Sequence, residues 1–319
     1  MKCSDKYIWM CSLLSILLLA ACSDDDKADK PKNNEITLDA DVWQMMEGTR
    51  VTTFDNQAAL RTESHFTAAV YQGNTATPYI NTTTVDWDGT NSKWVFSDGK
   101  HYWPASGNLD FFAYMPVTTP GYISSVNYAV DGTPAPAPYF VCANLPMTDV
   151  GQRGLREFIW ALSPAQNKAS QGATGVTMNF KHPFALIKFV IAAGSGEHVQ
   201  VNRISIAGLN TGGTCTFNAA GTASTWSSQT GSATLTITPA NPLKYNTAFT
   251  ETTLLMVIPN TDTKTLTVNG TWDDWSDNIT KDISTNISID WHPGYKYTYN
   301  LTVTPYALKV DATKYTEQW

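Results

Sequence analysis

Cys22 is the residue whose setting predicts the most specific chemistry in this sequence. It lies in the stretch LLLAACSDDD, where leucines give way to two alanines, the cysteine and an acidic run. Small side chains leave a signal peptidase room to approach the backbone, and they place the thiol where it can be acylated. We therefore expect residues 1–21 to be a lipoprotein signal peptide and Cys22 to be the lipidated first residue of the mature chain. The alternative is an ordinary secretory signal peptide that happens to contain a cysteine.

The residues on either side of Cys22 agree with export. Lys2 and Lys6 precede an apolar run at 8–19. This run is shorter than the roughly 20 residues that a helix needs to cross a bilayer. Acyl chains on Cys22 would anchor the chain to a membrane, since each buried methylene contributes about 0.8 kcal/mol. Residues 22–34 form an acidic tether, and its opening SDDD resembles the export tag of surface lipoproteins. A merely solvated tether is the alternative.

Side chains that could act in catalysis are scattered along the chain. None of the five histidines lies at metal-ligand spacing from another histidine, a cysteine or a carboxylate, so we expect neither a metal nor a cofactor. The cluster TWDDWSD contains Asp273 and Asp274, and paired acids of this kind can flank a glycosidic bond. A turn between two strands explains the cluster better. Motifs for a nucleophile elbow, a phosphate-binding loop or a dinucleotide-binding turn are missing, and the sequence predicts no enzyme.

Composition indicates an extracellular all-β protein. Of the 319 residues, 15% are charged and 12% are aromatic, and threonine and asparagine are abundant, which is typical of exposed strands and turns. The formal net charge is −7, and the lack of any basic stretch argues against nucleic-acid binding. Cys142 and Cys215 are the cysteines that follow Cys22. Two cysteines make no disulfide framework, and we expect buried thiols.

Alternation of apolar and polar residues begins at Ile36 and recurs along the chain. The first expected strand places four apolar side chains on one face: Ile36, Leu38, Ala40 and Val42. Further strands, separated by turn formers, are expected at 65–71, 82–87, 93–98, 109–116, 138–144, 157–163, 176–180, 184–191, 199–207, 214–219, 233–238, 252–259, 264–272, 295–303 and 307–312. Strands at this spacing indicate β-sandwiches.

A polar segment, AQNKASQGATG at 165–175, interrupts the alternation. It suggests a boundary between an N-terminal sandwich, 35–170, and a C-terminal sandwich, 171–319. The residues at 56–60 approach the spacing of an amphipathic helix, but this stretch is too short for a stable isolated helix.

Four stretches of the chain resemble the fimbrillin family of surface-pilus subunits: KHYWPASGNLDFFAYMP (100–116), NFKHPFALIKFVI (179–191), LMVIPN (255–260) and WHPGYKYTYNLTV (291–303). The leader with Cys22 and the SDDD tag also fit this family. The resemblance implies two tandem transthyretin-like β-sandwich domains, export as a lipoprotein to the surface of the outer membrane, and a place in a fimbria.

The resemblance also implies a route of assembly. In stalk members a trypsin-like protease cuts after an arginine, the first strand leaves, and the C-terminal strand of a neighbouring subunit fills the vacated groove. Carried over to this chain, the cut follows Arg50, with Arg61 as second choice. The displaced side chains are Ile36, Leu38, Ala40 and Val42, and the donor strand within 304–319 supplies Tyr306, Leu308, Val310 and Ala312. The alternative is that 304–319 stays as the last strand of its own domain.

We therefore predict a structural subunit of a cell-surface fimbria, assembled by removal of its first strand and donor-strand exchange. Its expected partners are other fimbrial subunits, identical or different, and the outer membrane through the lipid on Cys22. The alternatives are a tip adhesin or anchor subunit of the same fimbria, or a surface glycan-binding lipoprotein that never polymerises. In those roles the partner would be a host or glycan ligand.

Overall fold

The computed structural model describes residues 34–42, 56–73, 75, 77–128, 137–171, 175–239, 249–250, 254–274 and 277–318. Residues from Ile36 onward form one compact unit. Strands make up most of the described residues, together with two short helices, so the predicted all-β class is confirmed. Cys22, the SDDD stretch and Arg50 lie outside the described residues.

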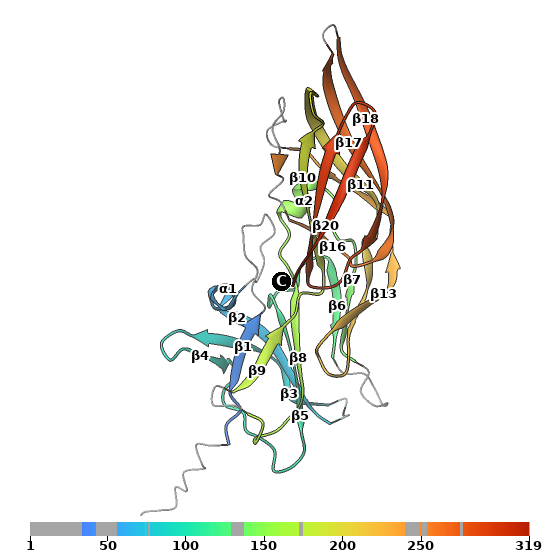
Figure 1. Cartoon of the computed structure of the whole chain (residues 1–319). Coiled ribbons are helices and arrows are strands. Elements are labelled where there is room, and N and C mark those ends of the chain that lie inside the picture. The colour runs from blue at the N-terminus through green and yellow to red at the C-terminus, as the bar shows by residue number, and fades with distance from the viewer. Residues whose placement is uncertain are drawn as a thin grey trace, which may run out of the picture. The chain divides into compact units, whose positions relative to one another are not determined.

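One sheet has seven strands in the order β8-β5-β2-β3-β4-β1-β9. Its strands are β1 (Leu38–Val42), β2 (His65–Gln72), β3 (Pro78–Asp88), β4 (Lys93–Phe96), β5 (Leu109–Met115), β8 (Ile159–Gln166) and β9 (Val176–Phe180). The pairings are antiparallel except for β1 with β9, which run parallel. Figure 1 shows β1, in blue, beside β9, in yellow-green.

This sheet curls until its two outer strands meet. Trp160 in β8 and Lys181, just after β9, form an isolated antiparallel bridge. The Lys181 amide donates to the Trp160 carbonyl at 2.8 Å, and the Trp160 amide donates to the Lys181 carbonyl at 3.3 Å. The Ser163 hydroxyl on β8 adds a bond to the carbonyl of Thr177 on β9 at 2.6 Å. The curled sheet encloses a hydrophobic core, which includes buried side chains of β1, β4 and β9.

The remaining strands form three smaller sheets that share a second core. The first sheet has the order β14-β11-β17-β18: β14 (Ala233–Ile237), β11 (Val199–Leu209), β17 (Thr261–Asp274) and β18 (Asp277–Asp290). The second has the order β15-β10-β19-β20, with β16 also on β10: β15 (Phe249–Thr250), β10 (Ala185–Ala193), β19 (Tyr295–Val303), β20 (Leu308–Gln318) and β16 (Leu255–Val257). The third has the order β13-β12-β7-β6: β13 (Ser224–Thr230), β12 (Gly212–Phe217), β7 (Tyr139–Cys142) and β6 (Ile123–Asn127).

Strand β5 contributes to both cores because its side chains alternate between the two faces of the sheet. Phe111 packs inside the curled sheet with Trp103, at 5.7 Å between ring centroids. Phe112, on the opposite face, joins the second core and contacts Trp160 edge-on. The apolar run LDFFAYM therefore serves two packing layers at once.

The expected boundary near residue 170 is crossed by the sheets in both directions. The polar segment around it connects β8 to β9 within the seven-stranded sheet, and β9 completes that sheet from the C-terminal side. Strand β7, from the N-terminal half, pairs with β12 instead, and β6 pairs with β7 at the edge of the same sheet. Pairing between strands distant in sequence leaves no local signal, so the alternation pattern alone could not assign these strands to a sheet.

Both helices begin at side-chain caps. In α1 (Gln57–Glu63) the Asn56 side chain accepts a bond from the Ala59 amide, and the helix ends at Ser64 in a left-handed conformation. In α2 (Asp149–Arg153) the Thr148 hydroxyl accepts from the Gly151 amide. Each cap satisfies an amide that the first turn of a helix leaves unpaired.

Candidate functional site around the first strand

The apolar side chains at the start of the chain enter the core of the curled sheet as the alternation predicts. Ile36, Leu38, Ala40 and Val42 are each at most 4% exposed. The intervening residues, such as Asp39 and Asp41, are half-buried. Full burial of a large aliphatic side chain contributes about 1.5–3 kcal/mol, so this short strand holds its place mainly through these side chains.

The backbone of β1 is held chiefly from one side. Every residue from Leu38 to Val42 has a register partner on β9, whereas toward β4 the pairing is confined to Leu38 with Trp94. Beyond that point the amides of Ala40 and Val42 are satisfied locally. They donate to the carboxylates of the preceding residues, Asp39 and Asp41, at 2.9 and 2.8 Å. The strand could therefore leave while breaking few bonds toward β4.

The entry to β1 is fixed by a set of specific contacts. The Ile36 amide donates to the His101 carbonyl at 2.8 Å. The side-chain oxygen of Gln171 accepts from the Thr37 amide at 3.2 Å and from the Trp103 indole at 3.0 Å. One amide side chain thus ties the strand to the wall of its own groove.

Gly175 brings β9 into close approach with the same segment. Its φ is +118°, a region that glycine adopts without strain. The next amide, of Val176, donates to the Thr37 carbonyl at 2.8 Å. Neither Gly175 nor Gln171 was predicted from the sequence. The available signal was a glycine directly before the apolar strand VTMNF.

A charge pair lies at the other end of β1. Burial lowers the pKa of Lys181 below its ordinary value, and the nearby Asp41 carboxylate opposes that lowering. Asp41 is the register partner of Asn179, two residues before Lys181. A carboxylate at this outward position of the strand therefore favours the charged form of the lysine.

Arg61, the second candidate for proteolytic cleavage, lies inside α1. Its guanidinium is 4.6 Å from the centroid of the Trp87 ring and donates to the Gln57 side chain at 3.1 Å. Glu63, at the end of the helix, pairs with Arg156. The backbone after Arg61 is thus held in a capped and packed helix, and it must unfold locally before a protease can bind it in extended form.

The C-terminal strand pairs within the chain itself. β20 is the outer strand of its sheet and pairs antiparallel with β19, where Leu308 faces Val303 and Ala312 faces Tyr299. Leu308 is buried and Val310 packs partly against the second core. Tyr306 precedes the strand and is 89% exposed. Tyr306, Leu308 and Val310 therefore do not share one environment in the isolated chain.

Among the described residues, no group of three or more His, Cys, Asp or Glu side chains could hold a metal ion. His182 is buried against Glu157 at 2.7 Å, a pairing that helps hold the segments beside β8 and β9 together. Within TWDDWSD, β17 ends at Asp274 and β18 begins at Asp277, so the cluster lies where two paired strands adjoin.

The two thiols are free and buried, as predicted. Burial raises the pKa of Cys142 to about 12 and raises that of Cys215 as well. A thiol with a raised pKa is a weak nucleophile at neutral pH, so both residues serve packing rather than chemistry.

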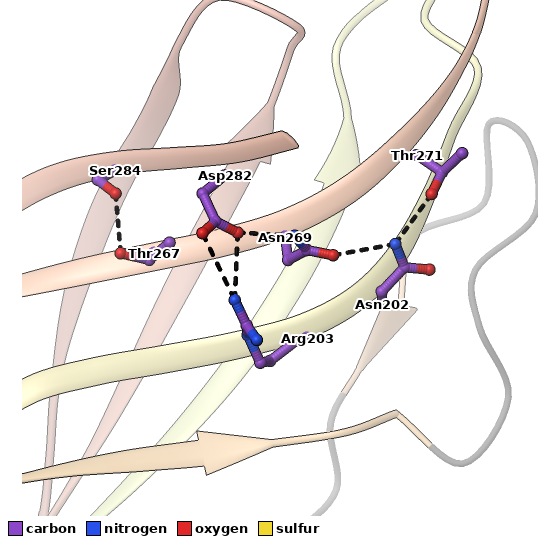
Figure 2. A network of polar contacts seen from close by, with 7 residues as sticks. All are labelled: Asn202, Arg203, Thr267, Asn269, Thr271, Asp282 and Ser284. Atoms are coloured by element: carbon purple, nitrogen blue, oxygen red, sulfur yellow. Dashed lines mark hydrogen bonds and ion pairs between the residues drawn. The ribbon is translucent and has the colours of Figure 1, made fainter. Parts of the chain in front are cut away.

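The outer face of β11, β17 and β18 carries a ladder of polar contacts (Figure 2). Asp282 accepts from Arg203 at 3.2 Å and from the Asn269 side chain at 2.7 Å. The Asn202 amide continues the ladder to Asn269 at 3.1 Å and to Thr271 at 2.9 Å. These groups bond to one another across three strands, so the ladder fixes the register of the long β17–β18 hairpin.

No helix among the described residues is long and apolar enough to cross a membrane.

Comparison with solved structures gives distant matches that span most of the chain. A protein from Bacteroides ovatus assigned to cell adhesion is 14% identical with a TM-score of 0.51, and the match covers 88% of this chain and 95% of that chain. One of the same description from Bacteroides uniformis is 18% identical with a TM-score of 0.48, covering 88% and 97%. The tip fimbrial protein Mfa3 from Porphyromonas gingivalis is 9% identical with a TM-score of 0.40, covering 78% and 92%. The B. ovatus match supports the β-sandwich fold.

A search among curated proteins finds no match. The family model described as fimbrillin-like matches residues 49–319, which is most of the chain. The chain belongs to the fimbrillin-like family.

Proposed function

We propose that this chain is a structural subunit of a cell-surface fimbria that assembles by exchanging its first strand for the C-terminal strand of a neighbouring subunit. Proteolysis after Arg50 would separate β1 from the rest of the chain. Lipidation of Cys22 would carry the precursor to the outer membrane before that cut. Membership of the fimbrillin-like family gives the class of protein.

The single observation that carries the proposal is the one-sided seating of β1. Its side chains fill the core, while its backbone is paired along its length with β9 alone. A strand held in this way leaves behind a groove with apolar pockets and an unpaired edge of β9. Folded proteins avoid such edges by pairing them, and an added strand supplies both the ladder bonds and the alternating side chains.

The C-terminal strand has the pattern that this groove requires. If Leu308 takes the place of Leu38, the two apolar sets coincide position by position. The same alignment puts Asp311 at the place of Asp41, where a carboxylate acts on Lys181. If the donor ran in the opposite direction, Ala307 would lie at the place of Asp41. The alignment therefore favours a donor that runs in the same direction as β1.

The choice of Arg50 over Arg61 also has physical support. Arg61 lies in a capped helix with its side chain over Trp87, whereas Arg50 is the single basic residue between positions 43 and 55. Proteases bind substrates in extended form, so a site within a packed helix is disfavoured.

The test compares Arg50→Ala with Arg61→Ala in full-length protein expressed in its own export pathway. Mass spectrometry of the surface-exposed protein reports the N-terminus, and detergent-resistant ladders on gels report polymer. We expect Arg50→Ala to accumulate unprocessed, lipid-bearing precursor without polymer and Arg61→Ala to behave as the unaltered chain. Processed polymer formed by Arg50→Ala at the normal level contradicts the assignment of the cut.

A second variant tests the donor strand separately. Val310→Asp changes a partly buried position, which its own domain tolerates better than it would a charge at the buried Leu308. We expect processed, folded monomers that do not polymerise, because a charged side chain cannot enter the pocket vacated by Ala40. Normal ladders from Val310→Asp would show that another segment joins the subunits.

A further inference from the structure

A pocket of about 530 Å³ opens at the end of β9. Three segments line it: the residues that end and follow β9, the turn into β13, and the loop before β19. Its lining consists of Phe180, Lys181, His182, Thr222, Ala223, Ser224, His292, Pro293, Gly294 and Tyr295. Phe180 is the register partner of Val42, the last residue of β1. The pocket therefore begins level with the end of β1.

The walls of this pocket are fixed by hydrogen bonds. The Gly294 amide donates to the Phe184 carbonyl at 2.8 Å. The Trp226 indole donates to the Pro183 carbonyl at 2.6 Å. Both bonds tie the second and third lining segments to the stretch that follows β9, so the pocket is a built feature of the fold.

The strand that we propose as donor is longer than the strand that it replaces. β1 has 5 residues and β20 has 11. With Leu308 at the place of Leu38 and the donor parallel to β9, Ala312 falls opposite Phe180 and the next residue opposite Lys181. The remainder, TKYTEQ at 313–318, then extends beyond the end of β1 and past Lys181, which lines the pocket.

We infer that this pocket receives residues 313–317 of the donor strand of a second copy of this chain, and so reads the donor beyond the groove itself. The inference rests on the proposed function. The chemistry of the two sides agrees. This overhang, residues 313–317, offers hydroxyl groups and an aromatic ring, and the pocket offers the hydroxyls of Thr222 and Ser224 and the Tyr295 ring.

Recognition of this overhang gives the assembly a selectivity that four apolar side chains alone do not provide. Many alternating strands could fill the groove of β1, whereas a strand that ends at the position of Ala312 would stop short of the pocket. The pocket thus distinguishes the C-terminal strand of this chain from short or unrelated strands.

The test uses full-length protein nicked at Arg50 with an arginine-specific protease and two fluorescent peptides from this sequence. The short peptide is 306–312, YALKVDA, and the long peptide is 306–318, YALKVDATKYTEQ. Anisotropy measures peptide binding, and mass spectrometry measures release of the N-terminal fragment. We expect both peptides to displace the fragment and the long one to bind at least ten times more tightly.

A pocket variant with a matched control completes the test. Ala223→Trp fills the pocket, while Ala219→Trp places the same side chain on the preceding turn, outside the lining. We expect Ala223→Trp to reduce the affinity of the long peptide to that of the short one and Ala219→Trp to change neither affinity. If both peptides bind equally to the unaltered chain, the pocket inference is wrong and the proposed exchange stands. If neither peptide displaces the fragment, the proposed exchange itself fails.

Discussion

Thr37 and Gly175 approach so closely that a single added carbon has no room between them. A Cβ atom on Gly175 would lie 2.5 Å from both the carbonyl carbon and the carbonyl oxygen of Thr37. These atoms belong to backbone, which cannot move aside as a flexible side chain can. The groove for β1 is therefore shaped by the absence of a side chain on its neighbouring strand.

Gly175→Ala should loosen β1 selectively. The substitution adds both the clash with Thr37 and the strain of a positive φ, of order 1–3 kcal/mol. Gly99→Ala is the matched control, because Gly99 has a φ of +117° and open space around its Cβ position. Hydrogen exchange should rise at 36–42 in Gly175→Ala well above the level in Gly99→Ala. Equal exchange in the two variants would mean that the contact with Thr37 does not seat the strand.

Leu38→Ala should destabilise the intact chain by about 2–5 kcal/mol, because it leaves a cavity in the core of the curled sheet. Asp39→Ala is its neighbour on the outer face and should cost less, since it removes only the local bond to the Ala40 amide. Urea unfolding of both variants measures the difference. A Leu38→Ala cost as small as that of Asp39→Ala would contradict the burial of β1 as a source of stability.

The alternation of β1 and β5 could be predicted from sequence because each residue's environment changes with a period of two along the strand. The long strand β18 was missed, although Ile279, Ile283, Ile287 and Ile289 all lie at odd positions. Threonine, serine and asparagine between them resemble a polar loop, and their role became visible only in the ladder with β17. Strand β6 was missed as well, and the assignment of β7 and β9 to sheets depended on distant pairing, which single-sequence patterns do not report.

Prediction of the site from the sequence is limited in the same way, because distant contacts leave no local pattern. The four apolar residues of the first strand were predicted because buried side chains recur at every second residue of a strand. Gln171 and Lys181 act on β1 from more than 130 residues away in the chain, so no spacing rule could join them to it. A helical period was noted at 56–60, over too few residues to predict a stable isolated helix. The cap at Asn56 explains why so short a segment is helical.

Asn56→Ala should expose Arg61 to proteolysis. Loss of an N-cap costs about 0.5–2 kcal/mol, which frays α1 and frees the backbone around Arg61 for extended binding by a protease. Thr148→Ala removes the cap of α2 and serves as the control for general loss of stability. A timed digestion followed by mass spectrometry should show faster cleavage after Arg61 in Asn56→Ala alone. Equal rates in both variants would indicate global unfolding instead.

The buried thiols predict a loss of stability at alkaline pH. The folded state holds the pKa of Cys142 at about 12, above its ordinary value of 9.0. The contribution of this thiol is therefore fully present below pH 9 and declines as the pH rises toward 12, because the unfolded thiol ionises while the buried one does not. The slope is about 1.4 kcal/mol per pH unit for one group.

Chemical unfolding of the unaltered chain and of Cys142→Ala, between pH 8 and pH 12, measures this contribution. Cys142→Ala should lose stability less steeply with pH, even though its absolute stability is lower. Parallel curves would show that the thiol ionises in the folded state as readily as in the unfolded state.

Asp41 and Asp311 should each stabilise a strand in the groove by favouring the charged form of Lys181. Asp41 does so within the chain, and Asp311 would do so across the contact between two subunits. Asp41→Asn removes the carboxylate that opposes the desolvation of Lys181, so the N-terminal fragment of a nicked chain should dissociate more readily. Because the lysine is only half-buried, we expect an effect of about 1 kcal/mol or less. A long donor peptide carrying Asp311→Asn should bind more weakly by a similar factor.

The decisive comparison repeats both measurements in a Lys181→Met chain. If the two aspartates act through the same lysine, neither substitution should have a further effect there, and the two coupling energies should agree. An effect of Asp311→Asn that persists without Lys181 would place the donor in another register, or in the opposite direction along β9. Agreement would fix the alignment of the incoming strand to a single residue, because a shift by one position moves the carboxylate to the opposite face.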